Sequence, residues 1–287
     1  MIKENTVDNE NWDLVIGPKK AILSVDLKSI WDYRDLLGLF VKRDFVSVYK
    51  QTILGPIWFL VQPILTTITF TIIFGNVAKI PTDGMPKILF YMSGITLWTY
   101  FADCVNKTST IFVANQGLFA KVYFPRLIVP ISIIVNNLFK LIIQLIMYTI
   151  FWLYYFSNGA NIMIDSTIYL IPVILLLTGL LGLSFGLIIS SLTTKYRDFT
   201  FLISFGIQLL MYASPIVYPL SVVPEKYKWI IMLNPISSLI ELFKFTTLGS
   251  GHIDISYLIY SVTFTLVALT LGILVFNKVE KTFIDTV

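Results

Sequence analysis

Long apolar stretches separated by short polar segments make up most of the chain after residue 54. A helix needs about 20 mainly apolar residues to cross the hydrocarbon core of a membrane. Six stretches are predicted to be membrane-spanning helices: 56–74, 88–105, 127–156, 168–192, 199–214 and 257–276. The pattern therefore predicts an all-α integral membrane protein with one spanning domain over residues 55–277.

The segment before the first span, residues 31–54, has the period of an amphipathic helix. Its apolar residues share one arc and its charged residues the opposite arc, as in helices that lie along a membrane surface. The apolar arc contains Tyr33, Leu36, Leu37, Phe40, Val41 and Val48. Asp44 falls inside this arc, so either the helix breaks there and Asp44 caps the next segment, or its carboxylate meets a basic partner. A turn at Gly55 and Pro56 then leads into the first span.

The third predicted span carries a polar stripe on an otherwise apolar helix. Its members recur every four residues: Ser132, Asn136, Lys140, Gln144 and Tyr148. An unpaired lysine at the bilayer centre costs about 2.5–3.5 kcal/mol, so Lys140 is expected to face a partner, the bundle interior or water. The stripe is either an interhelical hydrogen-bond seam or the wall of a transport path. Gln62 and Thr66 give the first span a mildly polar side as well.

Two further spans show features that predict packing. Asp103 and Lys107, four residues apart near the end of the second span, are placed to neutralise each other. Small residues on one side of the fourth span allow another helix to approach closely: Gly179, Gly182 and Gly186.

Prolines interrupt residues 215–250, between the fifth and sixth spans, at Pro215, Pro219, Pro224 and Pro235. The helical pieces between them hold about 8 and about 14 residues, too few at ~1.5 Å per residue to cross a ~30 Å core. The longer piece also contains Glu241 and Lys244. We predict a pair of short helices that enters from the outer face and returns to it, surrounded by protein.

Residues 106–127 are too polar and too interrupted to cross a membrane. They end in an aromatic and basic run that contains Leu118, Phe119, Lys121, Tyr123, Phe124 and Arg126. The residues alone leave two interpretations open, a short cytosolic helix or a plain surface loop.

Composition and charge limit the function classes. The chain is 56% hydrophobic and 13% charged, with a mean hydropathy of +0.80, which indicates a membrane protein. It has no Gly-x-x-x-x-Gly-Lys-Ser/Thr phosphate loop, one histidine, one cysteine and no cluster with metal-ligand spacing, so we expect no catalytic site, no metal and no cofactor in this chain. It also lacks a basic patch suited to nucleic acid.

Charge placement predicts the topology. Most lysines and arginines fall in the segments that the six-span arrangement places inside, which favours cytosolic termini at both ends. Residues 1–30, which lack the order of a cleavable signal peptide, and residues 278–287 are then cytosolic tails.

The chain resembles the permease subunits of ABC transporters that export polysaccharides and polyol phosphates, such as O-antigen, capsule and teichoic-acid exporters. The resemblance covers residues 30–250 and follows the family's order. It rests on Arg43-Asp44, Tyr49-Lys50-Gln51-Thr52-Ile53-Leu54-Gly55, Trp58, Gln62-Pro63, Lys121-Val122-Tyr123-Phe124-Pro125-Arg126, Tyr196-Arg197-Asp198, Ser214-Pro215-Ile216-Val217-Tyr218-Pro219, Val223-Pro224-Glu225-Lys226 and Leu233-Asn234-Pro235.

The resemblance implies a homodimer in the cytoplasmic (inner) membrane, with two copies of a separate ABC ATPase that binds ATP and Mg. It implies contact with membrane lipid and export of a lipid-linked polysaccharide along a path between the permease subunits. It favours a coupling helix within 106–127 that contacts the ATPase through Leu118, Phe119, Lys121, Tyr123, Phe124 and Arg126. The interface helix and cytosolic gate would comprise Arg43, Asp44, Tyr49, Lys50, Gln51, Gly55 and Trp58.

Two further sets of residues complete the prediction. Candidates for the translocation path are Gln62, Thr66, Asn136, Lys140 and Gln144. The external gate would contain Pro215, Tyr218, Pro219, Pro224, Asn234, Pro235 and Glu241. Two alternatives stay open at this point: an ABC permease that exports a lipid, drug or peptide, and a membrane channel or scaffold that does not use ATP.

Overall fold

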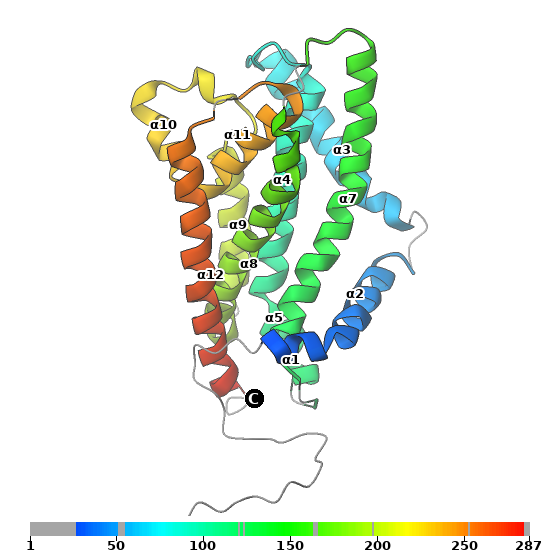
Figure 1. The fold of residues 1–287 in the computed structure, drawn as a ribbon, viewed down its shortest axis with the longest axis vertical. Coiled ribbons are helices and arrows are strands. Elements are labelled where there is room, and N and C mark those ends of the chain that lie inside the picture. The colour runs from blue at the N-terminus through cyan, green and yellow to red at the C-terminus, as the bar shows by residue number, and fades with distance from the viewer. Residues whose placement is uncertain are drawn as a thin grey trace, which may run out of the picture.

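The computed structural model describes residues 27–50, 55–119, 121–122, 124–162, 166–196, 198–251 and 253–283. Every regular element within these ranges is a helix, and the long helices form one bundle (Figure 1). In chain order they are α1 (Leu27–Asp32), α2 (Arg34–Tyr49), η1 (Gly55–Ile57), α3 (Trp58–Phe70), η2 (Thr71–Val77), α4 (Lys87–Ser109), α5 (Ile111–Ala114), α6 (Gln116–Phe119), α7 (Ile128–Ser157), η3 (Ser166–Leu170), α8 (Ile171–Lys195), α9 (Phe199–Tyr212), η4 (Leu220–Val222), α10 (Glu225–Met232), α11 (Pro235–Leu248) and α12 (Ile255–Phe283).

The helix lengths confirm a multi-pass membrane protein. Five helical stretches of the described chain are long and apolar enough to cross a membrane: Gly55–Val77, Lys87–Ser109, Ile128–Ser157, Thr167–Lys195 and Ile255–Glu280. The fifth predicted span, α9, is apolar but has only 14 residues. At ~1.5 Å per residue it reaches roughly 21 Å, less than a ~30 Å core. The count of six spans therefore stays a prediction.

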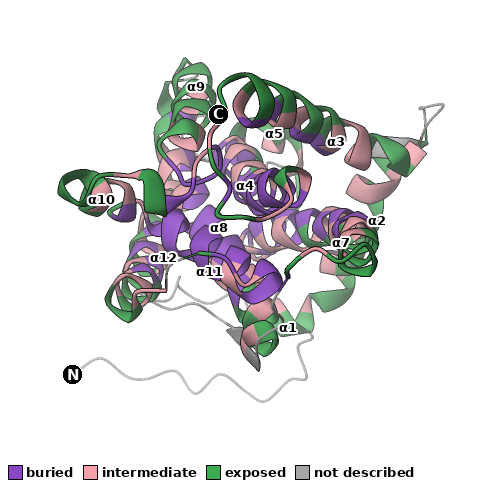
Figure 2. Ribbon diagram, turned by 90° about the horizontal axis from the view of Figure 1, so that it is seen from above, coloured by how far each residue is buried: buried purple, intermediate pink, exposed green. Residues whose placement is uncertain are grey.

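Helices α4, α8 and α11 form the centre of the bundle (Figure 2). In α4 78% of the most apolar stretch is buried, against 17% in the first span, so α4 packs on protein along most of its length while most of the first span lies at the surface of the bundle. The short α11 is buried along nearly its whole length. Its backbone is thus surrounded by protein, as a broken helix at membrane depth requires.

The glycines of α8 allow α4 to approach closely, as the sequence predicts. A Cβ atom at Gly182 would lie 2.6 Å from the Cβ of Cys104, and one at Gly186 would lie 2.4 Å from the Cβ of Thr108. Both distances are shorter than any ordinary carbon contact, so only glycine fits at this crossing.

We expect Gly186→Ala to destabilise the protein by about 1–3 kcal/mol, because the added methyl group overlaps the buried, β-branched Thr108. Thermal unfolding of the purified protein in detergent measures the change. The matched control is Gly206→Ala in α9, where a Cβ meets nothing within 4 Å. The same melting temperature for the two variants would contradict the prediction.

Candidate functional site

Helix α2 packs against α7 through the apolar arc that the sequence predicts. The Phe45 ring lies 6.2 Å from the Phe59 ring of α3 and 6.4 Å from the Phe139 ring of α7, centroid to centroid. The helix begins after a break at Tyr33 and continues through Asp44 without interruption. The amphipathic segment is therefore joined to both the first and the third spans.

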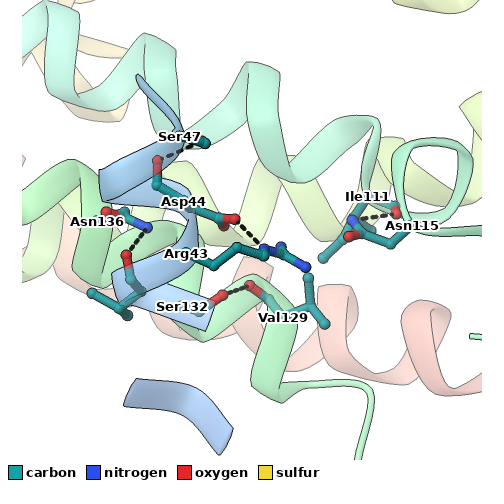
Figure 3. Close-up of polar contacts among 9 residues, drawn as sticks. Arg43, Asp44, Ser47, Ile111, Asn115, Val129, Ser132 and Asn136 are labelled. Atoms are coloured by element: carbon teal, nitrogen blue, oxygen red, sulfur yellow. Dashed lines mark hydrogen bonds and ion pairs between the residues drawn. The ribbon is translucent and has the colours of Figure 1, made fainter. Parts of the chain in front are cut away.

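Asp44 meets a basic partner, the second of the two predicted possibilities. Its Oδ1 accepts a hydrogen bond of 2.7 Å from Nε of the neighbouring Arg43 (Figure 3). The Arg43 guanidinium also lies 4.9 Å from the centroid of the Phe40 ring. The pair is partly exposed, with 50% of the Arg43 and 34% of the Asp44 side chain accessible.

The polar stripe of α7 joins α7 to its neighbouring helices. The Asn136 amide donates to the Val41 carbonyl of α2 over 3.2 Å (Figure 3), and the buried Gln144 amide donates to the Phe59 carbonyl of α3 over 3.1 Å. The Tyr148 hydroxyl donates to Thr247 of α11 over 3.0 Å. These are the contacts expected of a hydrogen-bond seam, whereas the role of the stripe in a translocation path stays a prediction.

Lys140 has the partner that its depth requires. Its Nζ lies 2.5 Å from Oδ2 of Asp103 in α4. The expected pairing of Asp103 with Lys107 is wrong, because Lys107 instead donates to Oδ1 of Asn137 over 2.8 Å. Both lysines therefore link α4 to α7.

A cavity of about 220 Å³ lies where α2, α3, α4 and α7 meet. Its lining consists of Asp44, Phe45, Ser47, Phe59, Lys107, Ile133, Asn136, Asn137 and Lys140. It brings together Asp44, Asn136 and Lys140, which the sequence placed in two separate sets. The sequence predicted Lys107 only as the charge partner of Asp103. Its actual partner, Asn137, was not predicted because Asn137 is not a member of the four-residue stripe.

Other predicted gate and path residues are not part of the lining of this cavity. Gly55 has a φ of 52°, the left-handed conformation that glycine favours, and starts the turn into α3. The Trp58 side chain is half exposed. Gln62 and Lys50 are exposed, and Thr66 is partly buried and donates to the Gln62 carbonyl. The Tyr49 side chain and Gln51 lie outside the described residues.

The predicted coupling segment contains two four-residue helices, α5 and α6. They lie at the same end of the bundle as α1 and the last turns of α12, while α10 lies at the opposite end (Figure 1). Lys121 is exposed, Leu118 is partly buried, and Phe119 and Phe124 are buried. Tyr123 lies outside the described residues.

Five phenylalanines at this end form a cluster that we call the aromatic junction: Phe40, Phe112, Phe119, Phe124 and Phe276. The ring of Phe112 stacks on Phe276 of α12 with centroids 4.8 Å apart. Phe119 of α6 lies 5.9 Å from Phe124, which lies 5.7 Å from Phe40 of α2. The junction thus joins α2, the predicted coupling segment and α12.

Arg126 joins the predicted coupling segment to α12. Its side chain is only 8% exposed, and Nη1 donates to the Glu280 carbonyl over 2.7 Å. Its Nε lies 3.8 Å from Oε1 of Glu280, and its guanidinium lies 5.5 Å from the Phe119 ring centroid. This burial makes Arg126 a residue that positions the segment, whereas the exposed Lys121 is available to a partner.

The predicted external segment forms α10 and α11, as expected from its prolines. Pro215, Pro219, Pro235 and Glu241 are buried, Tyr218 and Asn234 are partly buried, and Pro224 is exposed. Asn234 donates to the Ser214 hydroxyl over 2.9 Å, which ties the start of α11 to the end of α9.

Lys244 of α11 is a buried cation whose contacts the sequence did not predict. It is 1% exposed, and its Nζ lies 3.6 Å from Oε1 of Glu241 and 3.8 Å from the Phe90 ring centroid. Its ammonium also donates to the Pro215 carbonyl. It therefore holds α11 against both α4 and the turn after α9.

The described ranges contain no group of three or more His, Cys, Asp or Glu side chains that could hold a metal ion. What they do contain is a helical membrane bundle with an amphipathic helix, a partly charged cavity and an aromatic junction at one end. These features define a multi-pass helical membrane protein.

The chain belongs to the ABC-2 type transporter family, whose sequence profile matches residues 35–248. The O-antigen export system permease protein RfbA of Klebsiella pneumoniae is 29% identical over 256 residues, covering 88% of this chain and 94% of its own. RfbA of Myxococcus xanthus is 25% identical over 221 residues, covering 76% and 82%. The polysialic acid transport protein KpsM of Escherichia coli is 24% identical over 245 residues, covering 85% and 93%.

Proposed function

We propose that this chain is the transmembrane subunit of an ATP-driven exporter that moves a lipid-linked polysaccharide or related glycopolymer across the cytoplasmic membrane. The observation that carries the proposal is the similarity, over nearly the whole chain, to permeases named for the export of O-antigen and polysialic acid. The family match supports the transporter class independently of any cargo.

The proposed complex contains two copies of this chain and two copies of an ABC ATPase, which binds ATP and Mg. The surface of α9 supports the homodimer, since the helix is apolar and none of its residues is buried. Its exposed residues include Phe201, Leu202, Phe205 and Leu209. In the same proposal α9, the fifth span in chain order, completes a set of six crossings, and both termini are cytosolic.

The aromatic junction supports a coupling mechanism. An ATPase that moves α5 and α6 would displace Phe112 and Phe119. Because these rings pack on Phe276 and, through Phe124, on Phe40, the motion reaches α12 and the cytosolic α2 together. Packed side chains transmit such a shift because a well-packed core deforms little.

Depletion of this chain in its native host tests the proposal. We expect a glycolipid to accumulate on the cytosolic side, detected by mass spectrometry of membrane extracts. The complex purified gently from native membranes should contain an ABC ATPase together with that glycolipid. Recovery without an ATPase, or with a small amphiphile as the only cargo, would contradict the proposed function.

A further inference from the structure

We propose that the cavity between α2, α3, α4 and α7 binds a phosphate group that belongs to a lipid headgroup, and that Lys107 and Lys140 hold it. The inference deepens the proposed function and rests on it for the identity of the lipid. Four observations support it: donor capacity, charge balance, size and position.

Each of the two lysine ammonium groups carries more N–H donors than its described hydrogen bond uses. A lysine ammonium carries three N–H groups. Within the described part of the chain, Lys107 donates to the side-chain carbonyl of Asn137 and Lys140 to the Asp103 carboxylate. Since both side chains line the same cavity, their remaining N–H groups can converge on the oxygens of one phosphate.

The charge balance leaves one positive charge at the cavity. Asp103 offsets Lys140 over 2.5 Å, and Arg43 offsets the lining residue Asp44 over 2.7 Å. Lys107 faces the neutral amide of Asn137. Lys107 itself is exposed, but its ammonium lies beside the buried Asn137, where an anion stabilises it better than an uncharged sugar does.

The cavity is large enough for this group. A water molecule takes about 30 Å³ in the liquid, so about 220 Å³ accommodates a phosphate with attached atoms. Phe45, Phe59 and Ile133 give it apolar walls beside the lysines. This combination suits the junction between a charged headgroup and an apolar chain.

The position of the cavity agrees with a lipid source. Its wall on one side is α2, an amphipathic helix of the kind that lies at the depth of lipid headgroups. A lipid that approaches between α2 and α3 presents its phosphate at this depth. A soluble phosphate could reach the same lysines from water, so the experiment must separate the two sources.

Titration of the purified full-length protein with dodecyl phosphate, in dodecyl maltoside, tests the site. We expect Lys107→Met to weaken binding about tenfold or more, because it removes charge-assisted hydrogen bonds. Lys107→Arg, which keeps the charge, should restore most of the affinity. The matched control is Lys195→Met, which removes an exposed lysine at the end of α8 outside the cavity and should leave binding unchanged.

Two further titrations identify the source. Inorganic phosphate should bind at least tenfold more weakly than dodecyl phosphate, and neutral dodecanol should show no dependence on Lys107. Equal affinity for inorganic and dodecyl phosphate would overturn the lipid source. Binding that is insensitive to Lys107→Met, or equally weakened by Lys195→Met, would overturn the site itself.

These outcomes are independent of transport. Binding is measured without ATP or an ATPase, and thermal unfolding of the same samples should show that the exposed Lys107 can be replaced without loss of the fold. A protein that supports glycolipid export but does not bind dodecyl phosphate would overturn the cavity proposal alone. A protein that binds it through Lys107 but exports no glycopolymer would overturn the proposed function alone.

Discussion

Replacing Lys244 by methionine is expected to lower the free energy of unfolding by about 3–5 kcal/mol. The Lys244 side chain is 1% exposed. Its ammonium donates a hydrogen bond to the Pro215 carbonyl, pairs with the Glu241 carboxylate and lies over the face of the Phe90 ring. Methionine fills a similar volume but leaves the Glu241 charge, which is 2% exposed, without this neighbouring cation. The cost is therefore electrostatic rather than a packing defect.

Thermal or denaturant unfolding of the purified protein measures this loss. The matched control is Lys228→Met in α10, whose partner Glu225 is 86% exposed, and which should cost less than about 1 kcal/mol. The double variant Lys244→Met with Glu241→Gln should recover much of the stability, because it removes both buried charges. Equal losses for the Lys244 and Lys228 variants would refute the interpretation.

The sequence was sufficient to predict the helices wherever local signals define them. Proline positions and the lengths of apolar runs placed the pair of short helices at α10 and α11 with errors of about one residue at each end. The third span agrees with α7 equally well. These features depend on the backbone of the segment itself, so no knowledge of neighbouring helices is needed.

Partners across helices could not be predicted in the same way. The four-residue rule paired Asp103 with Lys107, whereas Asp103 meets Lys140, 37 positions away in the chain. In a bundle, a charge is stabilised by whichever opposite charge the packing of helices brings close, and this choice is invisible within one helix. The cavity is lined by residues of α2, α3, α4 and α7, so it could only be found in the folded chain.

The aromatic junction was missed for the same reason. Phe40, Phe112 and Phe276 lie in three distant segments, and each could equally have been a lipid-facing residue. The sequence also treated Lys121 and Arg126 alike, as basic residues of one motif. The two side chains differ in burial, because Arg126 lies inside the aromatic junction while Lys121 is exposed.

Charge reversal at Lys121 and at Arg126 should therefore have different consequences. Lys121→Glu is expected to reduce export about tenfold, since reversing the charge at the proposed docking surface weakens the contact with the ATPase, or misaligns it, by about 1.4 kcal/mol. Its effect on stability should stay within about 0.5 kcal/mol, because the side chain is exposed. ATP hydrolysis by the complex should continue, so the ratio of ATP consumed to polymer exported rises.

Arg126→Glu should instead reduce the amount of folded protein. It would place a carboxylate beside Glu280 in a position that is 8% exposed, and it would remove the hydrogen bond of 2.7 Å to the Glu280 carbonyl. We expect a loss of about 3–5 kcal/mol in the free energy of unfolding. The two variants are compared by unfolding in detergent, and by ATP hydrolysis and export in reconstituted vesicles. Normal export by Lys121→Glu would remove the coupling role from this segment, whereas a stable but uncoupled Arg126→Glu would show that Arg126 contacts the ATPase directly.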